Sequence, residues 1–413
     1  MIKKAVHLIS LLMPGMLVAA TGVGAGDLAT ASFTGNQLGI AILWAVVAGG
    51  ILKFVLTEGL ARWQLVTGQT FIQGVAAHYG LIAAWLFMPY LLVWTFFVAS
   101  ALINACGVTM NAIFPIYDSF TDKLIYGIIS SLTGFALVLA GGFNLFKKIM
   151  TVFIGIMFIT VLVTAILLWP GTSQVLTGLF VPVIPDVKVK GIVWTVALIG
   201  GVGGTVTILC YGYWIKELGR TSVKSIKICR IDLASGYLMT ILFGIAMVII
   251  GNSIEIEGHG AGLLIALANS LEKPLGLTGR WLFLIGAFCA IFSSLLGVWQ
   301  ATPYLFADSW HLFFARKKKP PRHIMHTKPY RYYLLAITFI PMLGLFMQFK
   351  EAQKLYALVG ALFIPLLALT LLMMNSRKKW LGKYCNGHIS TLMLTITLLF
   401  FLILALLQWS NIQ

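Results

Sequence analysis

Long apolar stretches recur along the whole sequence, and they constrain the fold more than any other feature. A window of about 20 apolar residues is long enough to cross a bilayer as a helix. Inside lipid the backbone must satisfy its own hydrogen bonds, which a helix does within one segment. The sequence is 60% hydrophobic and only 10% charged, against about 25% charged residues in ordinary soluble domains. It therefore predicts an all-α integral membrane protein.

We count eleven predicted transmembrane segments. The first follows Lys3 and Lys4 as a signal peptide would, but it is longer than the apolar core of roughly 7–15 residues that such a peptide has. The eleven segments lie near residues 8–32, 40–63, 81–105, 123–142, 149–169, 191–214, 233–252, 280–307, 331–348, 354–374 and 389–409.

The distribution of basic residues supports this count and accounts for the net charge of +17. If the N-terminus is cytoplasmic, 21 lysines and arginines fall on the inner side and seven on the outer side. This bias is typical of membrane proteins, so the basic loops indicate topology and not nucleic-acid binding. We expect a multi-pass protein of the inner or plasma membrane, with its N-terminus in the cytoplasm and its C-terminus outside. The sequence predicts no oligomeric state.

Two of the apolar segments are interrupted by glycines. The first segment contains Gly22, Gly24 and Gly26 on alternate positions, followed by Asp27. The sixth contains Gly200-Gly201-Val202-Gly203-Gly204. Glycine lets a backbone leave helical geometry at little cost, and a carboxylate at bilayer depth costs about 2.5–3.5 kcal/mol unless it is compensated. Both segments are therefore predicted to be broken helices.

The two interrupted segments are five spans apart, and this odd period inverts the second set of helices relative to the first. Paired interruptions in corresponding halves of a chain are typical of the binding site of a secondary transporter with inverted repeats. We therefore expect a single transmembrane transporter domain over residues 1–413. Its first repeat would cover residues 1–170, its second 171–376, and an appended helix 377–413.

The two breaks contain the candidate substrate-binding residues. A broken helix frees N–H groups at one end and carbonyl groups at the other, and these ends carry partial charges of opposite sign. Asp27 and Thr207 are also the candidate metal ligands. Other interpretations stay open: Asp27 as a helix N-cap, the glycines as packing surfaces, and the threonines bonded to their own backbone. The candidate substrate-binding residues are Gly24, Asp27, Gly204, Thr205 and Thr207.

The second segment adds two candidate charge partners, Lys53 and Glu58. Lys53 lies near the centre of the segment, where an ammonium needs a partner, and Asp27 and Glu58 are the acids at membrane depth that suit it. A snorkelling lysine is the alternative. Glu58 and Arg62 have the i, i+4 spacing of an ion pair at the membrane interface.

The chain resembles the Nramp family of divalent-metal transporters over nearly its whole length. The resemblance implies a five-plus-five helix fold with a cytoplasmic N-terminus, and proton-coupled uptake of manganese or iron. The stretches that carry it are Pro14 to Ala20, Leu43-Trp44, Ala61-Arg62, Thr67-Gly68, Gly203 to Val206, Asp232 to Ala234 and Phe363 to Leu366.

The departures from the family pattern concern the metal site itself. Where the family has Asp-Pro-Gly-Asn in the first break, this chain has Gly24-Ala25-Gly26-Asp27. Where the sixth segment of the family has Met-Pro-His, this chain has Thr207-Ile208-Leu209. The acidic pair of the third segment is also missing, with Ala101 and Asn104 near those places.

The expected donor set consists of one carboxylate, hydroxyls and backbone carbonyls. Such oxygens suit magnesium, calcium or manganese better than softer metals. We therefore expect a secondary active transporter that moves a harder divalent metal cation, such as Mg²⁺ or Mn²⁺, by alternating access and without a cofactor. The alternative is a transporter of a small organic cation or amino acid on the same fold, with Lys53 replacing a coupling ion. A receptor lacks support because the sequence shows no signalling domain, and no motif favours an enzyme.

Overall fold

The structure is a computed structural model that describes residues 12–185, 189–253, 262–314 and 324–410. Every regular element in these ranges is a helix, either an α-helix or a short 3₁₀ helix (η). Their bounds are α2 Met13–Gly22, α3 Ala25–Leu38, η1 Ile40–Ile42, α4 Leu43–Thr67, α5 Phe71–Tyr79, α6 Leu81–Ile113, α7 Ser119–Leu167, α8 Thr172–Phe180, α9 Val189–Gly201, η2 Val206–Leu209, α10 Cys210–Glu217, η3 Val223–Ser225, α11 Ile226–Asn252, α12 Gly262–Phe313, η4 Ile324–His326, α13 Lys328–Phe339, η5 Ile340–Phe346, α14 Phe349–Ala361, α15 Phe363–Asn375, α16 Lys378–Leu381, η6 Gly382–Tyr384 and α17 His388–Ser410.

The predicted membrane segments are found again as helices. In the described ranges eight helices are long and apolar enough to cross a membrane, and α2 with α3 forms a ninth candidate span that is bent by 63°. These nine correspond to the first eight predicted segments and the tenth. Helices also lie at the two remaining segments: α13 continues into η5, and α17 is apolar over His388–Ile403. The all-α membrane fold class is confirmed.

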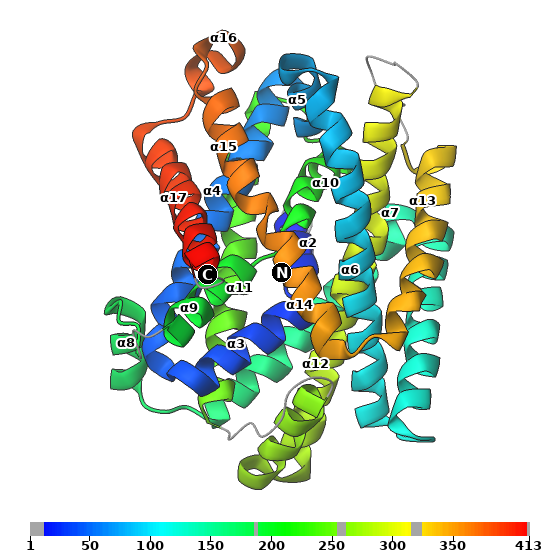
Figure 1. The fold of residues 1–413 in the computed structure, drawn as a ribbon, viewed down its shortest axis with the longest axis vertical. Helices are drawn as coiled ribbons and strands as arrows, with labels where there is room; N and C mark the ends of the chain where they lie inside the picture. The colour runs from blue at the N-terminus through cyan, green and yellow to red at the C-terminus, as the bar shows by residue number, and fades with distance from the viewer. Residues whose placement is uncertain (1–11, 186–188, 254–261, 315–323, 411–413) are drawn as a thin grey trace, which may run out of the picture.

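The helices form one bundle around the two interrupted spans. Figure 1 shows α2 and α10 near the centre of the view, with α6, α7 and α13 along one side and α4, α15 and α17 along the other. The half-helices of the broken spans thus lie inside the bundle, where neighbouring helices can satisfy the backbone groups that a break frees.

Two stretches between predicted transmembrane segments also contain helices. The segment after Pro170 includes α8, and the segment from Ser253 to Gly279 includes the first part of α12. This part bends away from the long helix at Gly276, whose φ is +67°.

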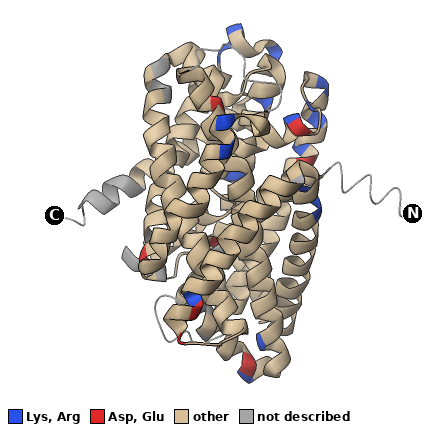
Figure 2. Ribbon diagram, turned by 90° about the vertical axis from the view of Figure 1, so that its right-hand side faces the viewer, with Lys and Arg blue, Asp and Glu red and all other residues tan. Residues whose placement is uncertain are grey.

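The charged residues are distributed unevenly along the bundle. Figure 2 shows most of the lysines and arginines of the described residues toward its upper end. The upper end is the one at which α5 and α16 lie in Figure 1. The uneven distribution of lysines and arginines between the predicted loops therefore appears in the structure as a basic end and a less basic end of the bundle.

Candidate substrate site at two helix breaks

The first break separates α2 from α3. The helix α2 ends at Gly22, and α3 begins after Gly24, whose extended backbone occupies the N-cap position. Because Gly24 is the N-cap, Asp27 does not have that role. Asp27 lies in the first turn of α3 instead, where a carboxylate is favoured by the N-terminal end of the helix dipole.

The second break separates α9 from η2 and α10. The helix α9 ends at Gly201, and the chain then passes through Gly203 and Gly204, whose φ angles are +85° and +82°. Such angles are strained for other residues, which explains why glycines occupy these positions. The predicted interruption of the sixth segment is confirmed.

The two breaks touch each other. A Cβ atom added at Gly22 would lie 2.7 Å from the carbonyl carbon of Gly203 and 3.0 Å from the nitrogen of Gly204. Neighbouring backbones approach this closely only where both chains lack side chains. The glycines therefore allow close packing of the two breaks as well as unusual backbone angles. We call the place where the two breaks meet the junction.

Asp27 lies at this junction. Its carboxylate interacts with the backbone N–H groups of Gly24 and Gly203 and with the charge of Lys53. Its second oxygen, Oδ2, is buried and has no hydrogen-bond partner. A buried carboxylate oxygen without a partner is costly, so this atom is available to a ligand.

Lys53 lies on α4 and reaches the second break. Its side chain is 2% exposed, which excludes snorkelling. The ammonium donates to the carbonyl oxygen of Gly200 at 3.1 Å and to that of Gly204. Its hydrogen-bond partners are thus backbone carbonyls, while Asp27 acts on it through charge alone.

Glu58 is held by other cations. It forms ion pairs with Arg62 at 3.2 Å and with Arg230 at 2.8 Å. The ion pair predicted from the spacing of Glu58 and Arg62 is confirmed. Among the described residues Glu58 makes no ion pair with Lys53, whose ammonium bonds carbonyls of the second break instead.

The two threonines of the second break have different surroundings. Thr205 accepts a hydrogen bond from the indole of Trp94 at 3.1 Å and also interacts with the hydroxyl of Tyr356. Thr207 is 7% exposed, and its hydroxyl lies over Gly204. Of the two, Thr207 is the one whose hydroxyl makes no hydrogen bond to another side chain among the described residues.

Two residues of α14 complete the junction, and the sequence did not predict them. A Cβ atom added at Gly26 would lie 3.0 Å from the ring of Tyr356 and 3.7 Å from Oε1 of Gln353. This amide oxygen is buried and has no partner. The spacing of Gln353, Tyr356 and Gly360 at i, i+3 and i+7 marks one face of a helix, which is the signal that could have found them.

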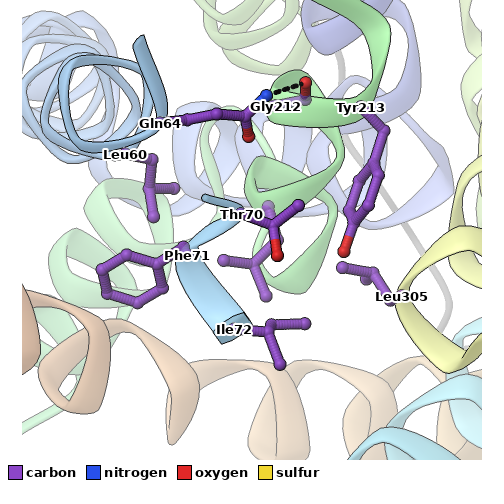
Figure 3. Close-up of a pocket in the computed structure, with 9 residues that line it drawn as sticks. Leu60, Gln64, Thr70, Phe71, Ile72, Gly212, Tyr213 and Leu305 are labelled. Carbon is purple, nitrogen blue, oxygen red and sulfur yellow. Dashed lines mark hydrogen bonds between the residues drawn. The ribbon is translucent and has the colours of Figure 1, made fainter. Parts of the chain in front are cut away.

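A small pocket lies between α4, the start of α5, η2, α10 and α12 (Figure 3). Figure 3 shows Thr70 and Tyr213 facing it from α5 and α10. The residues that line the pocket are Leu60, Gln64, Thr70, Phe71, Ile72, Leu209, Gly212, Tyr213 and Leu305.

Beside this pocket lies a buried carboxylate, Asp308 of α12. Its oxygens accept hydrogen bonds from the hydroxyl of Thr70 at 2.6 Å, the amide of Gln73 at 2.8 Å and the hydroxyl of Tyr213 at 2.8 Å. These neutral donors tie α5, α10 and α12 together at this end of the bundle.

The donors at the junction differ from those of a histidine- or cysteine-rich metal centre. Among the described residues, no three His, Cys, Asp or Glu side chains are grouped closely enough to hold a metal ion. A cation here would therefore be bound mainly by Asp27, amide and hydroxyl oxygens, backbone carbonyls and water.

A sequence profile of the family described as natural resistance-associated macrophage protein-like, or Nramp, matches residues 15–409. The chain belongs to the Nramp family. This match, covering almost the whole chain, confirms the resemblance that the sequence indicated, and it identifies a multi-pass membrane protein.

Among curated relatives, the divalent metal cation transporter MntH of Chromohalobacter salexigens is 27% identical over 183 residues. This similarity covers 42% of the chain and 39% of the relative, so it spans well under half of that protein. Among solved structures, the Eremococcus coleocola manganese transporter in complex with an aromatic bis-isothiourea substituted compound has a TM-score of 0.78 at 17% identity. That likeness covers 98% of this chain and 87% of that one.

The fold is also shared outside Nramp transporters. The structure of MhsT in complex with L-phenylalanine has a TM-score of 0.59 at 14% identity and covers 95% of this chain and 97% of that one. At these identities the likeness shows the common fold.

Proposed function

We propose that this protein is a secondary active transporter that moves a divalent metal cation across the membrane by alternating access. The observation that carries the proposal is the buried Oδ2 atom of Asp27, which has no partner at the junction of the two breaks. A carboxylate in this position attracts a cation, and membership of the Nramp family makes a divalent metal the first candidate. The names of the MntH relative and of the manganese transporter support the same substrate class.

The chemistry of the junction favours a hard ion. Thr207 and the amide oxygen of Gln353 offer oxygen, and the second break contains no methionine. Mg²⁺ and Mn²⁺ accept carboxylate, carbonyl and water ligands, and Mg²⁺ retains several waters when it binds. In this proposal Asp27 binds the ion, Thr207 and Gly24 line the site, and Thr205 positions the surrounding side chains.

A second candidate is a transporter of a small organic cation or amino acid. The observation that favours it is Lys53, whose ammonium compensates the charge of Asp27 within the junction. When Asp27 and Lys53 are both charged, the site is already neutral. A divalent ion would add two positive charges to it, whereas a single ammonium would add one and a zwitterion none. The fold is shared with MhsT, which was solved with L-phenylalanine.

The experiment that tests the proposal is isothermal titration calorimetry on the purified protein with Mg²⁺, Ca²⁺, Mn²⁺ and Fe²⁺. We expect saturable binding of Mg²⁺ or Mn²⁺ that disappears in Asp27→Asn. Glu272→Gln is the matched control, because Glu272 forms only an exposed ion pair with Arg280 at 3.4 Å; this variant should bind as the natural protein does.

The possible results separate the two candidates. If no ion of the panel binds, the metal proposal is wrong, and titration with amines and amino acids tests the second candidate. If an ion binds and Asp27→Asn binds it equally well, the protein is a metal binder but the site lies elsewhere. Uptake into proteoliposomes would then show whether the bound species is transported.

A further inference from the structure

The ammonium of Lys53 occupies the carbonyl end of a broken helix. An uninterrupted helix would use the carbonyl of Gly200 to accept the N–H of the residue four positions on. The helix α9 ends at Gly201, so this carbonyl lacks its usual partner and belongs to the negative end of the helix dipole. Lys53 donates to it at 3.1 Å and to the carbonyl of Gly204 beyond the turn.

Such a pair of carbonyls is a donor set that suits a free cation. In transporters with broken helices, unwound carbonyls and the C-terminal ends of half-helices coordinate monovalent cations. The carbonyls of Gly200 and Gly204 converge on one point inside the bundle, and Asp27 adds a negative charge nearby. The site therefore has the geometry and the charge of a cation site, and a side chain of the protein fills it.

We propose that the Lys53 ammonium is a tethered substitute for a bound monovalent cation, and that Gly200 and Gly204 form a latent site for such an ion. With Lys53 present, the protein holds the second break together without Na⁺ or K⁺. Without the ammonium, a small free cation takes its place. This inference does not depend on which substrate is transported.

The other buried lysine that bonds a carbonyl shows why Lys53 is distinct. Lys123 donates to the carbonyl of Met347 at 3.4 Å and lies over the ring of Phe120. It donates to one carbonyl, just past the end of η5, and its side chain makes no ion pair among the described residues. Lys123→Met is therefore the matched control for Lys53→Met.

The test measures the melting temperature of purified Lys53→Met in salts of Na⁺, K⁺, methylammonium and the bulky N-methyl-D-glucamine cation. The natural protein should melt at the same temperature in all four. Lys53→Met should melt lower in N-methyl-D-glucamine, and a small cation should raise its melting temperature saturably, by at least about 3 °C. Lys123→Met should show no preference among the cations.

The proposal is overturned if Lys53→Met is destabilised equally in every salt, because the lysine then serves only as a structural cap. It is also overturned if the variant is as stable as the natural protein and indifferent to cations. If Lys53→Met is not recovered from detergent, the same comparison is made in membranes with Lys53→Gln, whose neutral amide cannot replace the charge. Calorimetry of the natural protein with divalent ions stays independent of these results, so the proposed function and this inference can fail separately.

Discussion

Thr205 and Thr207 are only two residues apart, yet the structure gives them different tasks. Thr205 is a hydrogen-bond acceptor for Trp94 and interacts with Tyr356, so it connects the second break with α6 and α14. Thr207 makes no comparable side-chain contact in the described part of the chain. A hydroxyl without such a partner at the junction is free to face a substrate.

We expect Thr205→Val to destabilise the protein, because the indole N–H of Trp94 then stays buried without an acceptor. A lost partner of this kind costs about 1–3 kcal/mol. Thr207→Val should leave the stability nearly unchanged and weaken substrate binding instead. Thermal unfolding and calorimetry on both variants check this, and normal binding by Thr207→Val would remove Thr207 from the site.

Among the helices, α10 is the element that we expect to matter most for the proposed alternating access. Neighbouring helices hold α10 on two sides, because residues two positions apart in a helix point in nearly opposite directions. Tyr211 donates to Asp232 of α11 at 2.9 Å, and Tyr213 donates to Asp308 of α12 at 2.8 Å. Asp232 also accepts the backbone N–H of Gly15 in α2 at 2.7 Å. The half-helices α2 and α10 of the two broken spans therefore share one anchor.

We expect Tyr213→Phe to let α10 move away from α12 more often. A hydrogen bond is worth about 1 kcal/mol, or roughly a fivefold change in population. Cys210, at the start of α10, is fully buried, so its rate of reaction with N-ethylmaleimide reports the opening. Mass spectrometry of the labelled peptide should show reaction several times faster than in the natural protein.

Tyr126→Phe is the control for this experiment, because Tyr126 bonds the carbonyl of Phe114 far from α10. Its Cys210 labelling should match that of the natural protein. Equal labelling in Tyr213→Phe and Tyr126→Phe would show that the Tyr213 bond does not restrain α10.

At the scale of the whole molecule, the basic residues define an axis. The described lysines and arginines gather at the end of the bundle where α5 and α16 lie (Figures 1 and 2). Membrane proteins retain this end in the cytoplasm. Asp232 and Asp308 both accept hydrogen bonds from α10, so in the proposed transport cycle we expect α2 and α10 to close the junction toward the cytoplasm.

This orientation predicts the sides on which the two chain ends lie. An epitope placed before Met1 should be protected from protease added to intact cells, and an epitope placed after Gln413 should be cleaved. Permeabilised cells, in which both epitopes are cleaved, are the control. Protection of both epitopes in intact cells would mean an even number of spans and would contradict the count of eleven.

Local physics was sufficient for much of this protein. Apolar length determined the membrane class and most spans, and glycine spacing indicated both breaks, because hydropathy and backbone freedom are properties of neighbouring residues. The pair of Glu58 and Arg62 also follows from helical spacing within one segment. Asp27 was placed at the junction by its position beside a break.

Tertiary structure decided the partners of the polar groups. Lys53 meets carbonyls 147 and 151 positions away, and Gln353 and Tyr356 approach Gly26 from another span. Tyr211, four residues after Thr207, donates to Asp232 of another span. A sequence shows which buried groups need partners, but helices far apart in the chain supply those partners only when they pack, since a membrane helix can present any of several faces to its neighbours.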